Sequence, residues 1–226
     1  MQTVGIIGGL GPETTAEFYL KLIFSSFEKD KKKRPPVLIW SIPLEYQLEQ
    51  DFITKAKGIE KYIPYLQDAA KRLENGGADF IVIPCNSVHL AIDAVRQVVK
   101  IPVLSIVEET EEFLKKRNIK EIALLATNPT IKANLYDLKN IKIHLPIEKD
   151  QKKIGQLINN LVRSRYSKKD QTELIKIIQK FAEKDVKHVV LACTDLQLLT
   201  PTYAGTKIFD SMAILAEATI EKILKC

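Results

Sequence analysis

The chain has 226 residues, of which 46% are hydrophobic and 27% charged, a balance typical of a globular protein with a sizeable core. Its net charge of +6 is spread along the chain without interleaved aromatic residues, which argues against a nucleic-acid-binding groove. No apolar run could span a bilayer, and the N-terminal residues enter a predicted strand without a basic leader. We therefore expect a cytoplasmic protein with neither a nucleic-acid nor a membrane partner, and interpret the basic run 29–34 as a solvated loop.

The three cysteines, Cys85, Cys193 and Cys226, give an odd number in a chain without a secretion signal. This argues against a disulfide framework. The sequence contains no Cys-x-x-Cys pair and no His/Cys cluster with metal-ligand spacing, so we expect no bound metal. Cys226 is the last residue, and we assign it no function.

The first half of the chain alternates apolar strands with amphipathic helices. Strands are expected over residues 3–9, 37–42, 80–83 and 101–106, and helices over 13–27, over 59–75, after Cys85 and from about 108. The first strand ends in Gly-Gly-Leu-Gly-Pro at 8–12. Thr14 stands where a dinucleotide fingerprint needs glycine, so we expect only that backbone N–H groups there could bind an anion such as a carboxylate.

The second half repeats this order. Strands are expected over 121–127 and 141–145, before Cys193 and over 206–209, a turn over 128–130 with a helix from about 131, and helices over 151–164, 170–184 and 211–225. Such alternation is typical of parallel sheets covered by helices. We predict an α/β fold of two pseudo-symmetric three-layer lobes with mostly parallel sheets and an active-site cleft between them. The N-terminal lobe would comprise residues 1–106 plus 208–226, and the C-terminal lobe 107–207.

Two cysteines occupy matching corners of the two halves. Residues 70–90 and 178–198 align without a gap at an offset of 108 positions, and in each an apolar strand ends in a cysteine followed by small polar residues. Two such units can look alike by chance, and free cysteines are often buried as small hydrophobes. The coincidence of Cys85-Asn86-Ser87 with Cys193-Thr194-Asp195 nevertheless favours a paired site.

Two facing thiols can invert a carbon centre. A thiolate can take a proton from a carbon acid while the second thiol returns one to the opposite face. Both cysteines precede a predicted helix, a position that lowers a thiol pKa. Asn86, Ser87 and Thr194, with nearby backbone N–H groups, could hold a carboxylate and stabilise an enolate-like intermediate. This scheme needs no cofactor.

Five segments of the chain resemble the cofactor-independent aspartate/glutamate racemases: VGIIGGLGPETTAEFY at 4–19, GADFIVIPCNSVH at 77–89, IPVLSIVEET at 101–110, IALLAT at 122–127 and LACTDLQLL at 191–199. The resemblance covers nearly the whole chain. It departs from the family pattern at Ser87, Ala192 and Asp195, where threonine, glycine and glutamate are usual.

The resemblance implies a PLP-independent amino-acid racemase acting on aspartate or glutamate, with Cys85 and Cys193 as the acid/base pair. The substrate-binding residues that it implies are Leu10, Asn86, Ser87, Val88, Thr127, Arg163, Thr194 and Asp195. Arg163 stands where aspartate-specific members carry a lysine, and Arg165 or Lys168 could reach the site instead. His89 could either tune the Cys85 thiol or pack at the lobe interface. By analogy, we also expect a homodimer.

The sequence leaves the identity of the substrate open. Aspartate racemases often carry Pro-Asp-Arg after the second strand, whereas this chain has Pro43, Leu44 and Glu45. Losing a cation and gaining an anion disfavours an acidic side chain, so glutamate or neutral amino acids are alternative substrates. Related enzymes of the wider superfamily, such as hydantoin racemases, maleate isomerases and arylmalonate decarboxylases, are a second alternative. A non-catalytic protein that binds small carboxylates is a third.

Overall fold

The computed structural model describes residues 1–31 and 33–225, so Lys32 of the basic run and Cys226 lie outside the described part. The N-terminal half contains, in chain order, β1 (Val4–Gly8), α1 (Pro12–Lys29), β2 (Val37–Ser41), α2 (Tyr46–Lys55), α3 (Ile59–Asn75), β3 (Phe80–Val82), the 3₁₀ helix η1 (Ser87–Ala91) and α4 (Ile92–Arg96). The rest contains α5 (Ile106–Lys116), β4 (Glu121–Ala126), α6 (Asn128–Lys132), β5 (Lys142–His144), α7 (Glu148–Val162), α8 (Lys168–Ala182), β6 (His188–Ala192), the 3₁₀ helix η2 (Leu196–Leu199), β7 (Lys207–Asp210) and α9 (Ser211–Leu224).

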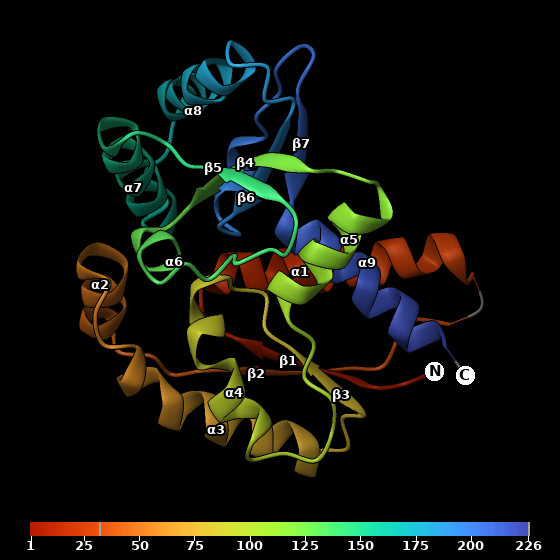
Figure 1. The fold of residues 1–226 in the computed structure, drawn as a ribbon. Helices are drawn as coiled ribbons and strands as arrows, with labels where there is room; N and C mark the ends of the chain where they lie inside the picture. Colours follow the sequence, from red (N-terminus) through yellow and green to blue (C-terminus); the bar gives the residue numbers. More distant parts are fainter. Residues whose placement is uncertain (32, 226) are drawn as a thin grey trace.

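Two separate parallel sheets form the framework, as the alternating pattern predicts. The first has the order β2-β1-β3 and the second the order β5-β4-β6-β7. In Figure 1 the second sheet lies above the first, and α1, α5 and α9 lie between them. No helix of the described residues is long and apolar enough to cross a membrane.

Both faces of each sheet are covered, which gives the three layers expected for each lobe. In the first sheet, Val4 and Ile6 pack into a cluster with residues of α1 and α9, whereas Ile7 packs into the cluster with α3. This alternation follows from the two-residue period of a strand. In the second sheet, Leu125 packs with α7 and α8, and Leu124 faces α5.

The strand predicted over 101–106 is not formed. Only Val103 makes an isolated parallel bridge, to Ile81 of β3. The chain then leaves the sheet because Ser105 caps α5: its hydroxyl accepts a hydrogen bond from the N–H of Glu108.

Two helices differ from the expected pattern. The predicted turn at 128–130 is the first turn of α6, whose N-cap Thr127 accepts a hydrogen bond from the N–H of Thr130. α2, which the sequence analysis left unassigned, follows β2 and contacts α6 and α7 of the other lobe.

The pairing of β7 with β6 places residues 207–210 in the second sheet. The segment after 207, which was expected in the N-terminal lobe, therefore begins as a strand of the other sheet. Only α9 returns, packing Met212 and Leu215 against the first sheet. The division into two lobes remains our proposal, with its last boundary at the start of α9.

Candidate functional site

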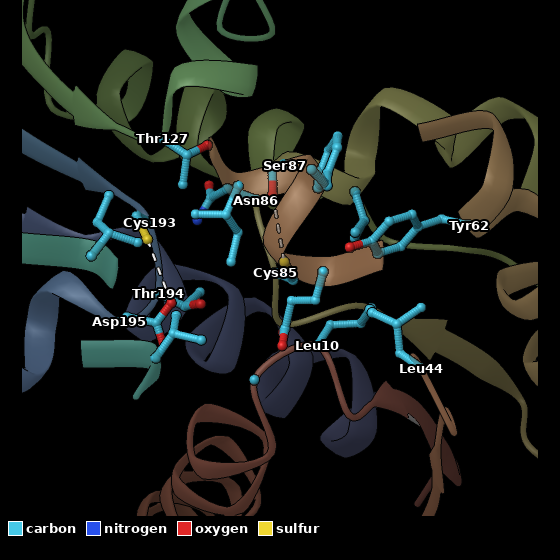
Figure 2. Close-up of a pocket in the computed structure, with 17 residues that line it drawn as sticks. Leu10, Leu44, Tyr62, Cys85, Asn86, Ser87, Thr127, Cys193, Thr194 and Asp195 are labelled. Atoms are coloured by element: carbon cyan, nitrogen blue, oxygen red, sulfur yellow. Dashed lines mark hydrogen bonds between the residues drawn. The ribbon is translucent and has the colours of Figure 1, made fainter. Parts of the chain in front are cut away.

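One pocket lies where the carboxyl ends of the two sheets face each other. Both lobes contribute to its walls. The described residues that line it are Leu10, Gly11, Leu44, Glu49, Phe52, Ile53, Tyr62, Cys85, Asn86, Ser87, Val88, Thr127, Ile158, Val162, Cys193, Thr194 and Asp195. Cys85 follows β3 of the first sheet and Cys193 follows β6 of the second, so the two cysteines approach the pocket from different lobes (Figure 2).

The Cys85 corner is held by a buried histidine. Cys85 Sγ lies 3.9 Å from Ser87 Oγ, at the start of η1. His89 Nδ1 lies 2.7 Å from the carbonyl oxygen of Cys85, and the N–H of Ile106 donates to His89 Nε2 at 3.1 Å. Because Nε2 accepts, Nδ1 carries the proton and donates to Cys85. Burial lowers the pKa of His89 to about 4, which keeps the ring neutral.

The Cys193 corner also precedes a short 3₁₀ helix, but here a carboxyl group contacts the thiol. The Cys193 thiol donates to Asp195 Oδ2 over 3.6 Å, and the Cys193 carbonyl accepts from the N–H of Leu196 at the start of η2. Burial raises the pKa of Asp195 to about 6, and the charges of Glu13 and Glu49 act in the same direction. Asp195 therefore titrates just below neutral pH.

The thiol pKa values contradict the expectation from helix position. Burial, followed by the charge of Asp195, raises the pKa of Cys85 to about 11. The same two causes raise the pKa of Cys193 well above its usual range, and Cys85 adds to the shift. Each cysteine precedes only a short 3₁₀ helix, whose few N–H groups do not offset the loss of water. Both thiols therefore carry their protons at neutral pH.

Most of the predicted substrate-binding residues lie on the pocket wall. They are Leu10, Ser87, Val88, Thr127, Thr194 and Asp195. Asn86 also lines the pocket, but its amide is used within the protein: Nδ2 donates to Ser211 Oγ at 3.0 Å and Oδ1 accepts from the Tyr136 hydroxyl. Asn86 is thus placed to position the corner rather than to bind a carboxylate with its side chain.

Arg163 is not among the described residues that line the pocket. It follows the last residue of α7, is exposed, and its Nη2 donates to Gln50 Oε1 of α2 at 2.8 Å. Arg165 and Lys168 are exposed as well. Arg163, which was expected to replace a substrate-binding lysine, therefore joins α7 to α2 instead.

The wall that α2 and α3 supply was not expected from the sequence. Glu49, Phe52 and Ile53 come from α2, and Tyr62 from α3. The spacing of Leu44, Leu48 and Phe52 by four residues was the signal that could have located this helix and its apolar face.

Comparison with known proteins identifies the family to which the chain belongs. The family model of the Asp/Glu/Hydantoin racemases matches residues 7–219. The chain belongs to this racemase family. Racemases are isomerases, and the resemblance stated from the five sequence segments is confirmed.

Individual relatives agree with this assignment. The chain is 30% identical, over 98% of each sequence, to the broad-specificity amino-acid racemase RacX of Bacillus subtilis (strain 168). An aspartate racemase homologue from Pyrococcus horikoshii OT3 has a TM-score of 0.81 at 30% identity, with both chains fully covered. The aspartate racemase of Picrophilus torridus has a TM-score of 0.82 at 24% identity, over 99% of this chain and 94% of that one, and supports the fold alone.

Proposed function

We propose that this racemase-family chain interconverts the enantiomers of an α-amino acid, with Cys85 and Cys193 as its acid/base pair and no cofactor. The observation that carries the proposal is that cysteines from two different lobes line one pocket. An amino acid bound between them would present opposite faces of its Cα to the two sulfur atoms.

The reaction needs one thiolate and one thiol. The thiolate takes the Cα proton, the electron pair of that bond stays on a planar carbanion, and the opposite thiol delivers its proton to the other face. Because a charge on Cys85 raises the pKa of Cys193, the second thiol keeps its proton once the first is ionised, and the pair then holds one acid and one base. The α-ammonium group of the substrate would lower the thiol pKa values by opposing the charge of Asp195.

The polar wall is suited to the α-amino and α-carboxylate groups. The hydroxyl groups of Ser87, Thr127 and Thr194 are available as donors to a carboxylate, and Asp195 is the acceptor for the ammonium group. Donors to the carboxylate also stabilise the enolate-like charge that develops when the Cα proton leaves.

Deuterium exchange tests the proposal. The purified protein is incubated in D₂O with each common amino acid, exchange at Cα is followed by proton NMR, and enantiomers are separated by chiral chromatography. We expect exchange with inversion in the parent and at least about a hundredfold loss in Cys85→Ala and in Cys193→Ala, the usual contribution of an acid/base group. If Cys193→Ala inverts its substrate at the parent rate, the two-base scheme is wrong.

A non-catalytic protein that binds small carboxylates is the second candidate. The observation that favours it is the raised pKa of both thiols, since such a protein has no use for reactive thiolates. Ligand binding without isotope exchange for any amino acid would support this candidate against the racemase.

We also propose that the protein is a homodimer and that it lies in the cytoplasm. Leu20, Phe24 and Phe27 form an apolar stripe on α1 and are 48%, 67% and 59% exposed. Spacings of four and three residues place them on one helix face, and an isologous contact would cover the stripe of both copies at once. We expect light scattering to give a dimer that Phe24→Glu converts to a monomer; a monomeric parent protein would overturn this expectation. Cell fractionation tests the location.

A further inference from the structure

The pocket has an acidic lining. Glu49 and Asp195 both line it, and none of the lining side chains that the structure describes is lysine or arginine. Asp195 already has a role in the proposed function, as the acceptor for the α-ammonium group. Glu49 has none, although it lies on the wall that binds the substrate.

Glu49 is a half-buried carboxylate on the pocket-lining side of α2. It forms no salt bridge with any described residue. Burial and the nearby charge of Glu13 raise its pKa. It shares the pocket with Cys85, Tyr62 and Asp195, and its charge raises the pKa values of all three. A carboxylate in this position is best satisfied by a cation brought in from outside the protein.

The wall around Glu49 is apolar. Leu44, Phe52 and Tyr62 pack in the same hydrophobic cluster as Cys85, and the rings of Phe52 and Tyr62 lie 5.0 Å apart. In Figure 2, Leu44 and Tyr62 lie on the far side of Cys85 from Cys193, Thr194 and Asp195. This compartment lies beside the polar wall that would hold the α-amino and α-carboxylate groups. It suits a side chain with an aliphatic stem.

We propose that the pocket selects amino acids with a long cationic side chain, such as lysine, ornithine or arginine, and that Glu49 is the specificity-determining residue. The methylene stem would pack on the apolar wall and the cationic head would pair with Glu49. Aspartate or glutamate would instead bring a further carboxylate beside Glu49 and Asp195. This inference rests on the proposed function, because it takes the substrate to be an α-amino acid.

A matched pair of amino acids tests the role of the charge. Lysine and norleucine share the four-carbon stem, and only lysine carries the terminal ammonium group. Exchange at Cα is measured for both, and for glutamate, with the parent protein, Glu49→Gln and the control Glu45→Gln. Glu45, whose charge was expected from the sequence to oppose an acidic substrate, is instead the exposed N-cap residue of α2 and does not line the pocket. Its substitution therefore makes the same charge change outside the site.

We expect the parent to prefer lysine over norleucine in kcat/KM, and Glu49→Gln to reduce this preference at least about tenfold, in line with loss of a charge-assisted hydrogen bond. Glu45→Gln should leave the preference unchanged. Three results would overturn the inference while leaving the racemase intact. They are equal exchange for lysine and norleucine, fastest exchange with glutamate, and a lysine preference that Glu49→Gln leaves unchanged. Absence of exchange with every amino acid would overturn the proposed function. Calorimetric titration of lysine then decides the inference separately: binding that Glu49→Gln weakens supports it, and absence of such binding overturns it.

Discussion

Tyr136 donates a buried hydrogen bond to Asn86, the residue whose amide connects the two cysteine corners. Asn86, next to Cys85, donates to Ser211 Oγ at 3.0 Å, and Ser211 donates to the carbonyl of Leu191 at 2.8 Å. Leu191 lies two residues before Cys193 on β6. The chain of hydrogen bonds thus runs from one lobe to the other behind the pocket, where it can fix the separation of the two thiols.

Tyr136→Phe should weaken both the fold and the proposed reaction. The substitution keeps the buried ring but removes the donor to Asn86 Oδ1, leaving a buried acceptor unpaired. We expect a loss of about 1–3 kcal/mol in the free energy of unfolding, measured by urea titration. We also expect roughly a tenfold fall in kcat with little change in KM, because a small shift of one thiol spoils the alignment of the reacting atoms.

Tyr166→Phe is the matched control, since Tyr166 is 46% exposed. This substitution should change neither the free energy of unfolding nor kcat. A Tyr136→Phe protein that is destabilised but keeps its parent kcat would show that the hydrogen bond supports the fold without positioning Cys85.

Asp195→Asn should make Cys85 more reactive. Burial is the larger cause of the raised pKa of Cys85, and the charge of Asp195 is the second. Removing that charge lowers the pKa, so a larger fraction of Cys85 is thiolate at pH 8. We expect carbamidomethylation of Cys85 by iodoacetamide, followed by peptide mass spectrometry, to be severalfold faster than in the parent. The exposed Glu60→Gln serves as control, and an unchanged or slower rate at Asp195→Asn would contradict the assignment.

Much of the fold is predictable from the sequence because strand and helix periods are local. The strands around Ile6, Leu124 and Val190 lie where the apolar runs predict them. The segment 101–106 was taken for a strand because its composition is apolar, whereas the Ser105 cap ends its pairing after one bridge. Whether this segment pairs further with β3 or turns into α5 depends on tertiary packing, which no local sequence pattern contains.

The site is predictable to a smaller degree. The offset of 108 positions identifies Cys85 and Cys193 as matching corners, and both line the pocket. The direction of their pKa shifts was wrong, because the extent of burial depends on how the lobes close over the thiols. Glu49 was missed for a related reason: the placement of its helix depends on contacts with α6 and α7 of the other lobe, which no local pattern contains. Charge complementarity across lobes is a property of the assembled fold.

Asp195→Asn should also change how stability depends on pH. The folded-state pKa of Asp195 is about 6, above its usual 3.8. Between these values the unfolded chain loses the proton and the folded protein keeps it, so Asp195 reduces stability as the pH rises from about 4 to 6. Asparagine does not ionise. We therefore expect the variant to be more stable than the parent at pH 8, with the difference vanishing near pH 4 in urea titrations; a constant difference would contradict this.

His89 should act on stability in the opposite direction over nearly the same range. Its folded-state pKa is about 4, below the usual 6.5, because burial favours the neutral ring. As the pH falls from 6.5 to 4 the unfolded chain takes up the proton first, so the parent protein loses stability. His89→Gln keeps an acceptor for the N–H of Ile106, and His89→Asn keeps a donor for the carbonyl of Cys85.

Each His89 variant therefore loses one of the two hydrogen bonds, and we expect each to be about 1–3 kcal/mol less stable than the parent at pH 8. Neither carries the titrating ring, so both should lose less stability than the parent between pH 6.5 and 4. Urea titrations at half-unit pH steps measure both effects. If both variants keep the acid sensitivity of the parent, another group carries it, and His89 serves only as packing between the Cys85 corner and α5.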